Sequence, residues 1–183
     1  MSTKIVEPTV WAGCLACYNE GRLTGHWFGV TEIGDVGMAE IHRGTNVDWK
    51  RENHEEPWIF DTSDLPISKE MDLMEAARWG EVYEEAGDDW PAVAAWVASG
   101  DYIAEAHSDI PVLTDWTDRY RGCWPDFKTF AYQLAEDLNM FEGLEEESDV
   151  VRYFGWDAWI RDLEMGYSVV NAPDYSVFVF ESL

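Results

Sequence analysis

Residues 9–30 read TVWAGCLACYNEGRLTGHWFGV, and this stretch decides the fold of the first part of the chain. Residues 9–18 form an apolar run typical of a strand, and residues 23–30 form a second one. Asn19-Glu20-Gly21 between them supplies turn chemistry. The stretch therefore predicts an antiparallel hairpin with a short connection.

Towards the C-terminus, the hairpin is followed by two further short apolar stretches, for which we expect strands at 38–42 and 58–60. The polar stretch 43–56 between them is expected to be a loop. Together these elements predict a small β-rich module over residues 1–65.

Helical patterns begin near Ile67. A helix is expected over 71–85, capped by Asp64 or Ser68 and ended near Gly87. Asp89 is the expected cap of a second helix, with Pro91 in its first turn and Gly100 at its end. A short helix is expected over 101–107. The sequence thus predicts an acidic helical module over residues 66–107.

The last part of the chain mixes both patterns. Asp126 is the expected cap of a helix over 127–140, a second amphipathic helix surrounds Trp156 and Trp159, and strands are expected at 167–170 and 175–180. This gives a C-terminal α+β module over 108–183. The predicted fold class is α+β, an elongated chain of two to three small modules.

Charge limits the function more than any motif does. The 183 residues include 37 Asp or Glu and 12 Lys or Arg, for a formal net charge of -25. Binding to nucleic acid or to an anionic membrane is excluded, because both need clustered Lys and Arg. A disordered acidic tail is excluded as well, since 46% of the chain is apolar and 15% aromatic.

The cysteines and the hydropathy indicate a cytosolic protein. Three cysteines form no even disulfide framework, which favours a reducing compartment. No apolar run approaches the roughly 18 residues of a membrane span, and the N-terminus does not resemble a signal peptide.

Cys14 and Cys17 form a CxxC, the feature most typical of an enzyme or a metal site. A zinc site needs a second ligand pair, which the spacing of Cys123 and the four histidines does not provide. Two residues three apart on a strand also face opposite sides. The sequence therefore predicts buried structural cysteines and no bound metal or cofactor.

Catalytic motifs are missing. The sequence contains no HExxH, no GxSxG, and no glycine-rich phosphate loop. Trp90, Trp156 and Trp159 lie on helical stripes, so they are expected in the core rather than on a carbohydrate platform. We expect a protein that is not an enzyme.

The acidic residues are the main functional signal. Glu81, Glu84, Glu85 and Asp88 fall on one helix face, where each like-charge pair at i, i+4 costs about 0.2–0.5 kcal/mol. Residues 61–110 hold 13 acids and only 2 bases. One interpretation is a solvated, salt-adapted surface. The other is a surface that imitates nucleic acid, whose duplex carries one charge per about 1.7 Å, so that the net charge matches roughly 40 Å of DNA.

The candidate partner-binding residues are the acids in the two densest groups and between them. They are Glu81, Glu84, Glu85, Asp88, Asp89, Asp101, Glu105, Asp109, Asp115, Asp118, Glu136, Asp137, Glu145, Glu146, Glu147 and Asp149.

Three segments resemble the ArdA antirestriction family. Residues 11–28 are similar to its YN-x-G-x-L-x-G-x-W pattern. Residues 120–137 are similar to its aromatic-x-G-x-aromatic turn with a Phe-Ala helix. Residues 152–170 are similar to its C-terminal segment ending in RDL. The resemblance implies a non-enzymatic inhibitor carried on plasmids, transposons or phages. It also implies an elongated homodimer that mimics bent DNA and occupies the DNA groove of type I restriction-modification enzymes.

Two alternatives stay open at this stage. A DNA mimic can be directed at another DNA-binding protein, such as a nucleoid protein, a repressor or a CRISPR effector. The chain can also be a salt-adapted acidic enzyme, whose acids serve only solvation. That the target is the specificity and modification subunits of a type I restriction-modification enzyme is implied only by the family resemblance.

Overall fold

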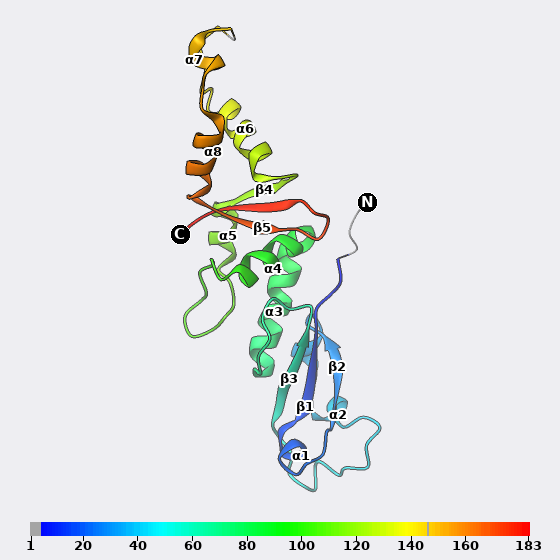
Figure 1. The fold of residues 1–183 in the computed structure, drawn as a ribbon. Helices are drawn as coiled ribbons and strands as arrows, with labels where there is room; N and C mark the ends of the chain where they lie inside the picture. Colours follow the sequence, from blue (N-terminus) through cyan, green and yellow to red (C-terminus); the bar gives the residue numbers. More distant parts are fainter. Residues whose placement is uncertain (1–4, 146) are drawn as a thin grey trace.

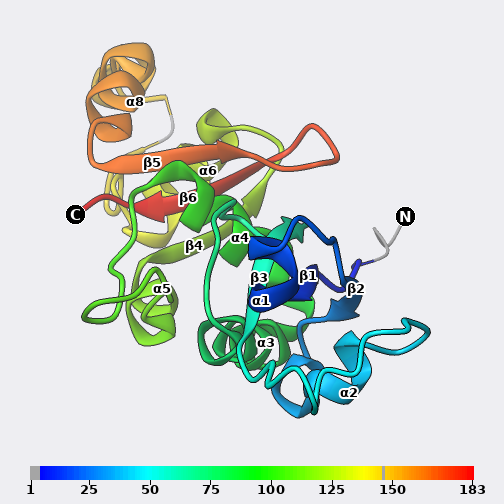
Figure 2. The ribbon, with the colours of Figure 1, turned by 90° about the horizontal axis from the view of Figure 1, so that it is seen from below.

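The computed structural model describes residues 5–145 and 147–183 as an elongated molecule (Figure 1). A first sheet lies at one end, two helices form the middle, and a second sheet with its own helices forms the other end. Viewed along the long axis, helices α2 (Met38–Ile41) and α8 (Trp156–Glu164) project on opposite sides (Figure 2). Within the described residues, no helix combines the length and apolar character needed to cross a bilayer.

The first sheet is antiparallel, with the strand order β2-β1-β3. Strand β1 (Thr9–Cys14) pairs with β2 (Gly25–Gly29), placing Trp11 opposite Trp27. Its other edge pairs with β3 (Pro57–Ser63). The predicted antiparallel pairing of the hairpin and the strand near residues 58–60 are confirmed, but the short connection is wrong, because residues 15–24 link β1 to β2 and include a helix. Residues 43–56 form turns and loops without a strand.

Two short helices lie where the sequence predicted strands. The first strand ends at Cys14, because its Sγ accepts a hydrogen bond from the Cys17 backbone N–H and caps α1 (Leu15–Asn19). The strand predicted at 38–42 is also wrong, since residues Met38–Ile41 form α2. There the Glu40 carboxylate accepts from the Gly37 backbone N–H, which fixes a helical first turn.

The middle of the molecule is made of α3 (Leu73–Ala86) and α4 (Trp90–Ser99), joined by a 3-10 turn at Gly87–Asp89. Both helices were predicted from the spacing of apolar residues and are confirmed. The cap of α3 is Asp72, however, and not Asp64 or Ser68. Another 3-10 turn, Ile33–Asp35, follows β2 and packs beside α3.

The helix predicted at 101–107 is wrong. Gly100 adopts a left-handed conformation that ends α4. The following backbone then pairs with residues 110–112, through Glu105 N–H to Ile110 O at 2.9 Å and Val112 N–H to Ile103 O at 2.9 Å. Hydrogen bonds across this short loop therefore satisfy backbone groups that a helix would otherwise pair.

The second sheet has the order β4-β6-β5 and is antiparallel. Helix α5 (Leu113–Arg119) leads into β4 (Tyr120–Trp124). Helices α6 (Phe127–Asp137), α7 (Asp149–Arg152) and α8 follow, and the chain ends with β5 (Tyr167–Asn171) and β6 (Val177–Glu181). The predicted α6, its Asp126 cap and both closing strands are confirmed.

Strand β6 separates two hydrophobic cores. Phe178 and Phe180 point to one face, where they join a core that runs through α4 and α3 to the first sheet. Val179 points to the other face and packs with Phe127 and Phe130 of α6. Because alternate residues of a strand face opposite sides, one strand holds the middle and the end of the molecule together. The α+β fold class is confirmed.

Candidate partner-binding surface

The exposed face of α3 carries the densest line of unpaired acids. Glu81, Glu84 and Glu85 are exposed, while Trp79 and Val82 of the same helix are buried. The apolar stripe fixes which way the helix turns, so the acids must face solvent. In the described part of the chain, no Lys, Arg or His side chain forms an ion pair with these three carboxylates.

Asp88 and Asp89 extend this line onto the 3-10 turn that follows α3, and both are exposed. Asp88, Asp89 and Asp174 also border a hollow of about 390 Å³ between this turn and the second sheet. The turn therefore brings acids from the middle of the chain close to one from its C-terminal hairpin.

The only bases in the segment 61–110, Lys69 and Arg78, are used elsewhere. Lys69 Nζ lies 2.8 Å from a Glu75 carboxylate oxygen and 2.5 Å from one of Asp109. Hydrogen bonds to Asp109 and then Glu75 raise the pKa of Lys69. Arg78 pairs with Glu105. The bases thus neutralise the neighbouring acids Glu105 and Asp109 and leave the α3 face uncompensated.

Glu81, Glu85 and Glu105 border a groove of about 290 Å³ between α3 and the segment that leads into α5. Arg78 lies at the same groove, together with apolar residues such as Ile110 and Val112. The structure therefore brings together acids that are about twenty residues apart in the sequence.

Asp101 and Asp115 have a different setting from the α3 acids. Both pair with Arg119, whose guanidinium lies 2.9 Å from Asp101 and 3.2 Å from Asp115. Arg119 is only 7% exposed and also donates to the Glu181 carbonyl oxygen at 2.6 Å. Asp118, on the outer side of the same helix, is exposed.

The second predicted group lies at the far end of the molecule. Glu136 and Asp137 are exposed on α6, Glu145 and Glu147 are exposed in the following loop, and Asp149 is exposed in the first turn of α7. Glu146 lies outside the described residues. Within the described part of the molecule, none of these five acids has an ion-pair partner.

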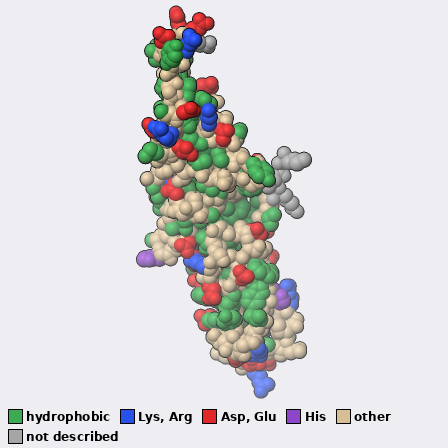
Figure 3. Space-filling model, viewed as in Figure 1, with side chains coloured by type: hydrophobic (Ala, Val, Ile, Leu, Met, Phe, Trp, Pro, Cys, Tyr) green, Lys and Arg blue, Asp and Glu red, His purple; other side chains and the backbone are tan. Residues whose placement is uncertain are grey.

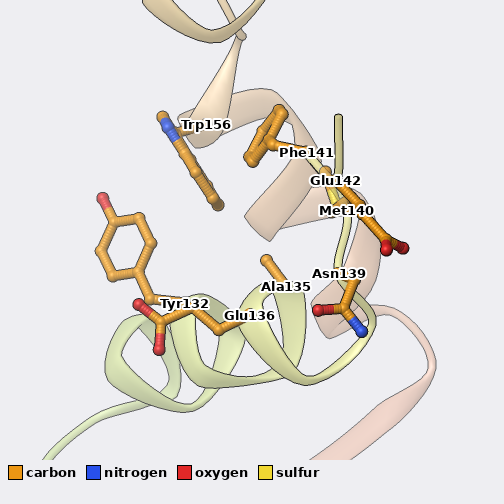
Figure 4. Close-up of a pocket in the computed structure, with 8 residues that line it drawn as sticks. All are labelled: Tyr132, Ala135, Glu136, Asn139, Met140, Phe141, Glu142 and Trp156. Atoms are coloured by element: carbon orange, nitrogen blue, oxygen red, sulfur yellow. The ribbon is translucent and has the colours of Figure 1, made fainter. Parts of the chain in front are cut away.

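An aromatic pocket beside this group was not predicted from the sequence. It has a volume of about 430 Å³, and Tyr132, Phe141 and Trp156 form its walls (Figure 4). Glu136 and Glu142 lie at its rim. Because Trp156 lies on a helical stripe, the sequence predicts it in the core, but in the structure it is only partly buried. Trp90 is buried as predicted. The stripe alone does not reveal how much of a ring its neighbours cover.

Acidic side chains extend over the whole length of the molecule. Figure 3 shows them from one end of the visible face to the other, between hydrophobic side chains. All three segments of the sequence, 1–60, 61–110 and 111–183, contain acids, and the excess of acids over bases is larger in the last two.

The buried cysteines Cys14 and Cys17 lie close together at the end of β1. Burial raises the pKa of the Cys14 thiol, which is opposite to the change that activates a nucleophilic cysteine. The expectation that Cys14 and Cys17 face opposite sides is wrong, because Cys14 ends a strand and Cys17 lies in the helix that it caps. His42 and His54 are the two described histidines that lie beside this pair.

Residues 10–176 match the family model described as Antirestriction protein (ArdA). No curated protein sequence matches the chain.

Proposed function

The chain belongs to the ArdA family of antirestriction proteins, and from this premise we propose which of its surfaces binds the target. Members of this family are non-enzymatic DNA mimics that inhibit type I restriction-modification enzymes. The proposed binding surface consists of the exposed acids without an ion-pair partner in the two densest groups. In the middle module these are Glu81, Glu84, Glu85, Asp88 and Asp89, and at the far end Glu136, Asp137, Glu145, Glu147 and Asp149.

The observation that carries this proposal is the uncompensated face of α3. Stability does not require Glu81, Glu84 and Glu85 to be acidic, because like charges on neighbouring turns repel. Two bases lie in the same segment, yet both pair with other acids. The negative charge is thus concentrated where a partner can reach it.

A basic DNA groove can hold this surface for the same reason that it holds DNA. Its Lys and Arg side chains meet regularly spaced negative charge, and counterions are released from both partners. The groove that we propose is the one formed by the specificity and modification subunits. Occupying it blocks modification as well as cleavage, because both reactions need bound DNA.

Asp101 and Asp115 have another role in this proposal, although the sequence places them among the candidates. Arg119 holds both, and removing either leaves a nearly buried cation short of a partner. We assign these two acids, and Glu105 and Asp109 with their own bases, mainly to the fold.

We further propose a homodimer in solution, in the cytoplasm of a bacterium that carries the gene on a mobile element. The C-terminal module exposes apolar side chains, including Tyr153 at 74% and Met165 at 83%, which a second copy can cover. Light scattering of the protein as it elutes from a size-exclusion column is expected to give twice the single-chain mass of 21.0 kDa.

The test is displacement of a DNA duplex from a purified type I modification complex. The variant Glu81→Gln/Glu84→Gln/Glu85→Gln removes three charges from the α3 face, and Asp35→Asn/Asp61→Asn/Asp64→Asn removes three from exposed positions in the first module. We expect at least tenfold weaker displacement by the first variant and a much smaller change in the second. Equal losses would mean that net charge alone, and not this face, determines binding.

A further inference from the structure

Two cysteine and two histidine side chains, of the types that bind metal ions, meet at the end of the first sheet that is farthest from α4. Cys14 comes from the end of β1, Cys17 from α1, His42 from the residue that ends α2, and His54 from the stretch before β3. All four are buried, with exposures of 1%, 0%, 4% and 3%. We propose that they bind one zinc ion.

The distances fit a tetrahedral site. Zn–S bonds of about 2.3 Å and Zn–N bonds of about 2.0–2.1 Å place sulfur and nitrogen ligands about 3.6 Å apart. Cys14 Sγ lies 3.4 Å from His54 Nδ1, and Cys17 Sγ lies 3.5 Å from the same nitrogen. Cys17 Sγ lies 3.6 Å from His42 Nε2. All four donor atoms lie within 4.8 Å of one another.

The second ring nitrogen of each histidine is already engaged. His42 Nδ1 lies 2.8 Å from the Met38 carbonyl oxygen, so it carries the proton and leaves Nε2 free to bind metal. His54 Nε2 lies 3.5 Å from a Glu52 carboxylate oxygen, which leaves Nδ1 facing the thiols. Zinc-binding histidines are commonly oriented by a backbone carbonyl or a carboxylate in this way.

The local fold explains why two residues three apart can bind one ion. Cys14 caps α1, and Cys17 lies in the first turn of that helix, where its backbone N–H donates to Cys14 Sγ at 3.4 Å. The turn from strand to helix therefore brings both sulfurs to one side.

The donor set favours a structural zinc ion over other metals. Two thiolates and two imidazoles suit the preference of Zn²⁺ for sulfur and nitrogen, whereas Mg²⁺ and Ca²⁺ need oxygen ligands. Four protein ligands in a buried site leave no position open for a substrate. The ion would hold the loop 43–53 at both ends, through His42 before it and His54 after it.

The first experiment measures metal in full-length protein purified without chelator. We expect one zinc per chain, and one equivalent released when a mercurial reagent modifies the thiols. Refolding with Co²⁺ should give the visible absorption bands of a tetrahedral site and a sulfur-to-cobalt charge-transfer band. The variants Cys14→Ser and His42→Asn should lose the metal. The matched controls Cys123→Ser and His107→Asn, at exposed positions, should keep it.

A second readout does not depend on variants. The loop contains Arg43, Lys50 and Arg51, which are exposed trypsin sites, while Arg161 on α8 is a site far from the cluster. Removing the metal with a strong chelator should accelerate cleavage in the loop at least tenfold and leave cleavage at Arg161 unchanged. Wild-type protein that contains no zinc, or Cys14→Ser that keeps as much zinc as wild type, would overturn the proposal.

Discussion

At the scale of single residues, Arg119 connects three parts of the chain. It pairs with Asp101 after α4 and with Asp115 on its own helix, and it donates to the Glu181 carbonyl oxygen at the end of β6. Its guanidinium also lies 5.6 Å from the centre of the Trp96 ring. A nearly buried cation with this many partners stabilises one arrangement of the segments that meet there.

Replacing Arg119 by Ala is expected to cost about 3–5 kcal/mol of unfolding free energy, because it leaves two partly buried carboxylates without a cation. Arg121→Ala provides the control, since Arg121 is about one-third exposed and its pair with Glu181 is worth about 1 kcal/mol or less. Urea unfolding of both variants measures the difference. Similar losses in the two variants would contradict the role given to Arg119.

Asp126 gives a prediction about pH. Hydrogen bonds from the Thr129 backbone N–H and then its hydroxyl lower the pKa of Asp126. A carboxyl whose folded pKa is depressed stabilises the fold above its unfolded pKa of about 3.9, and this contribution is lost as the pH falls through the folded value.

The Asp126→Ala variant should therefore lose about 0.5–2 kcal/mol at pH 7, the usual effect of removing a helix cap. Asp126→Asn keeps the capping oxygen, so it should be close to wild type at pH 7 and lose less stability between pH 5 and pH 3. Unfolding curves across this range test both statements. An Asn variant with the acid sensitivity of wild type would show that another group causes it.

At the scale of elements, helix α3 combines a tightly packed face with a repulsive one. A Cβ added at Gly80 would lie 2.2 Å from the Val30 carbonyl oxygen, so the helix touches the backbone that follows β2. On the other side, Glu81 repels Glu84 and Glu85 across one turn. The packed face keeps the acids in place in spite of that repulsion.

Gly80→Ala should destabilise the protein by about 1–3 kcal/mol, because a backbone atom cannot move aside as a side-chain tip can. Gly34→Ala is the matched control, since its nearest neighbour would be the Ala77 Cβ at 3.5 Å, an ordinary contact. Thermal unfolding compares the two. A neutral Gly80→Ala would mean that α3 can shift away from Val30.

Neutralising the α3 face should have the opposite effect on stability. The triple variant Glu81→Gln/Glu84→Gln/Glu85→Gln relieves the i, i+3 and i, i+4 repulsions, each worth about 0.2–0.5 kcal/mol. We expect a slightly raised melting temperature at low salt, together with the weaker DNA displacement. A destabilised triple variant would mean that these carboxylates serve the fold after all.

The elements that the sequence predicted correctly are those with strong local patterns. Helices α3, α4 and α6 follow from apolar spacing and end signals such as Gly87 and Gly100. Helices α1 and α2 were missed because each is short and depends on one capping contact, from Cys14 or Glu40. The segment 101–107 was misread because its backbone partners lie further along the chain.

The candidate site shows the same division. The exposed line on α3 follows from spacing alone, since i, i+3 and i, i+4 share a helix face. The pairing of Asp101 with Arg119 joins residues 18 apart in the sequence, and that of Cys14 with His54 joins residues 40 apart. Only the folded chain brings such partners together, so the sequence shows neither the ion pair of Asp101 nor the cluster of cysteines and histidines.

At the scale of the whole molecule, the fold is a rod with charge along its length. The core through β1, α3, α4 and β6 makes the first sheet, the central helices and the second sheet continuous. An elongated, continuous frame keeps the acids at fixed separations, as phosphates are along a duplex. A net charge of -25 on such a frame is the basis of the proposed mimicry.

The most direct test of this account is the affinity for a type I modification complex, measured across salt concentrations beside a DNA duplex. We expect the logarithm of the association constant to fall linearly with the logarithm of salt, with a slope close to that of the duplex. The two ligands should also exclude each other from the complex. Binding that is insensitive to salt, or that leaves the duplex bound, would contradict the account.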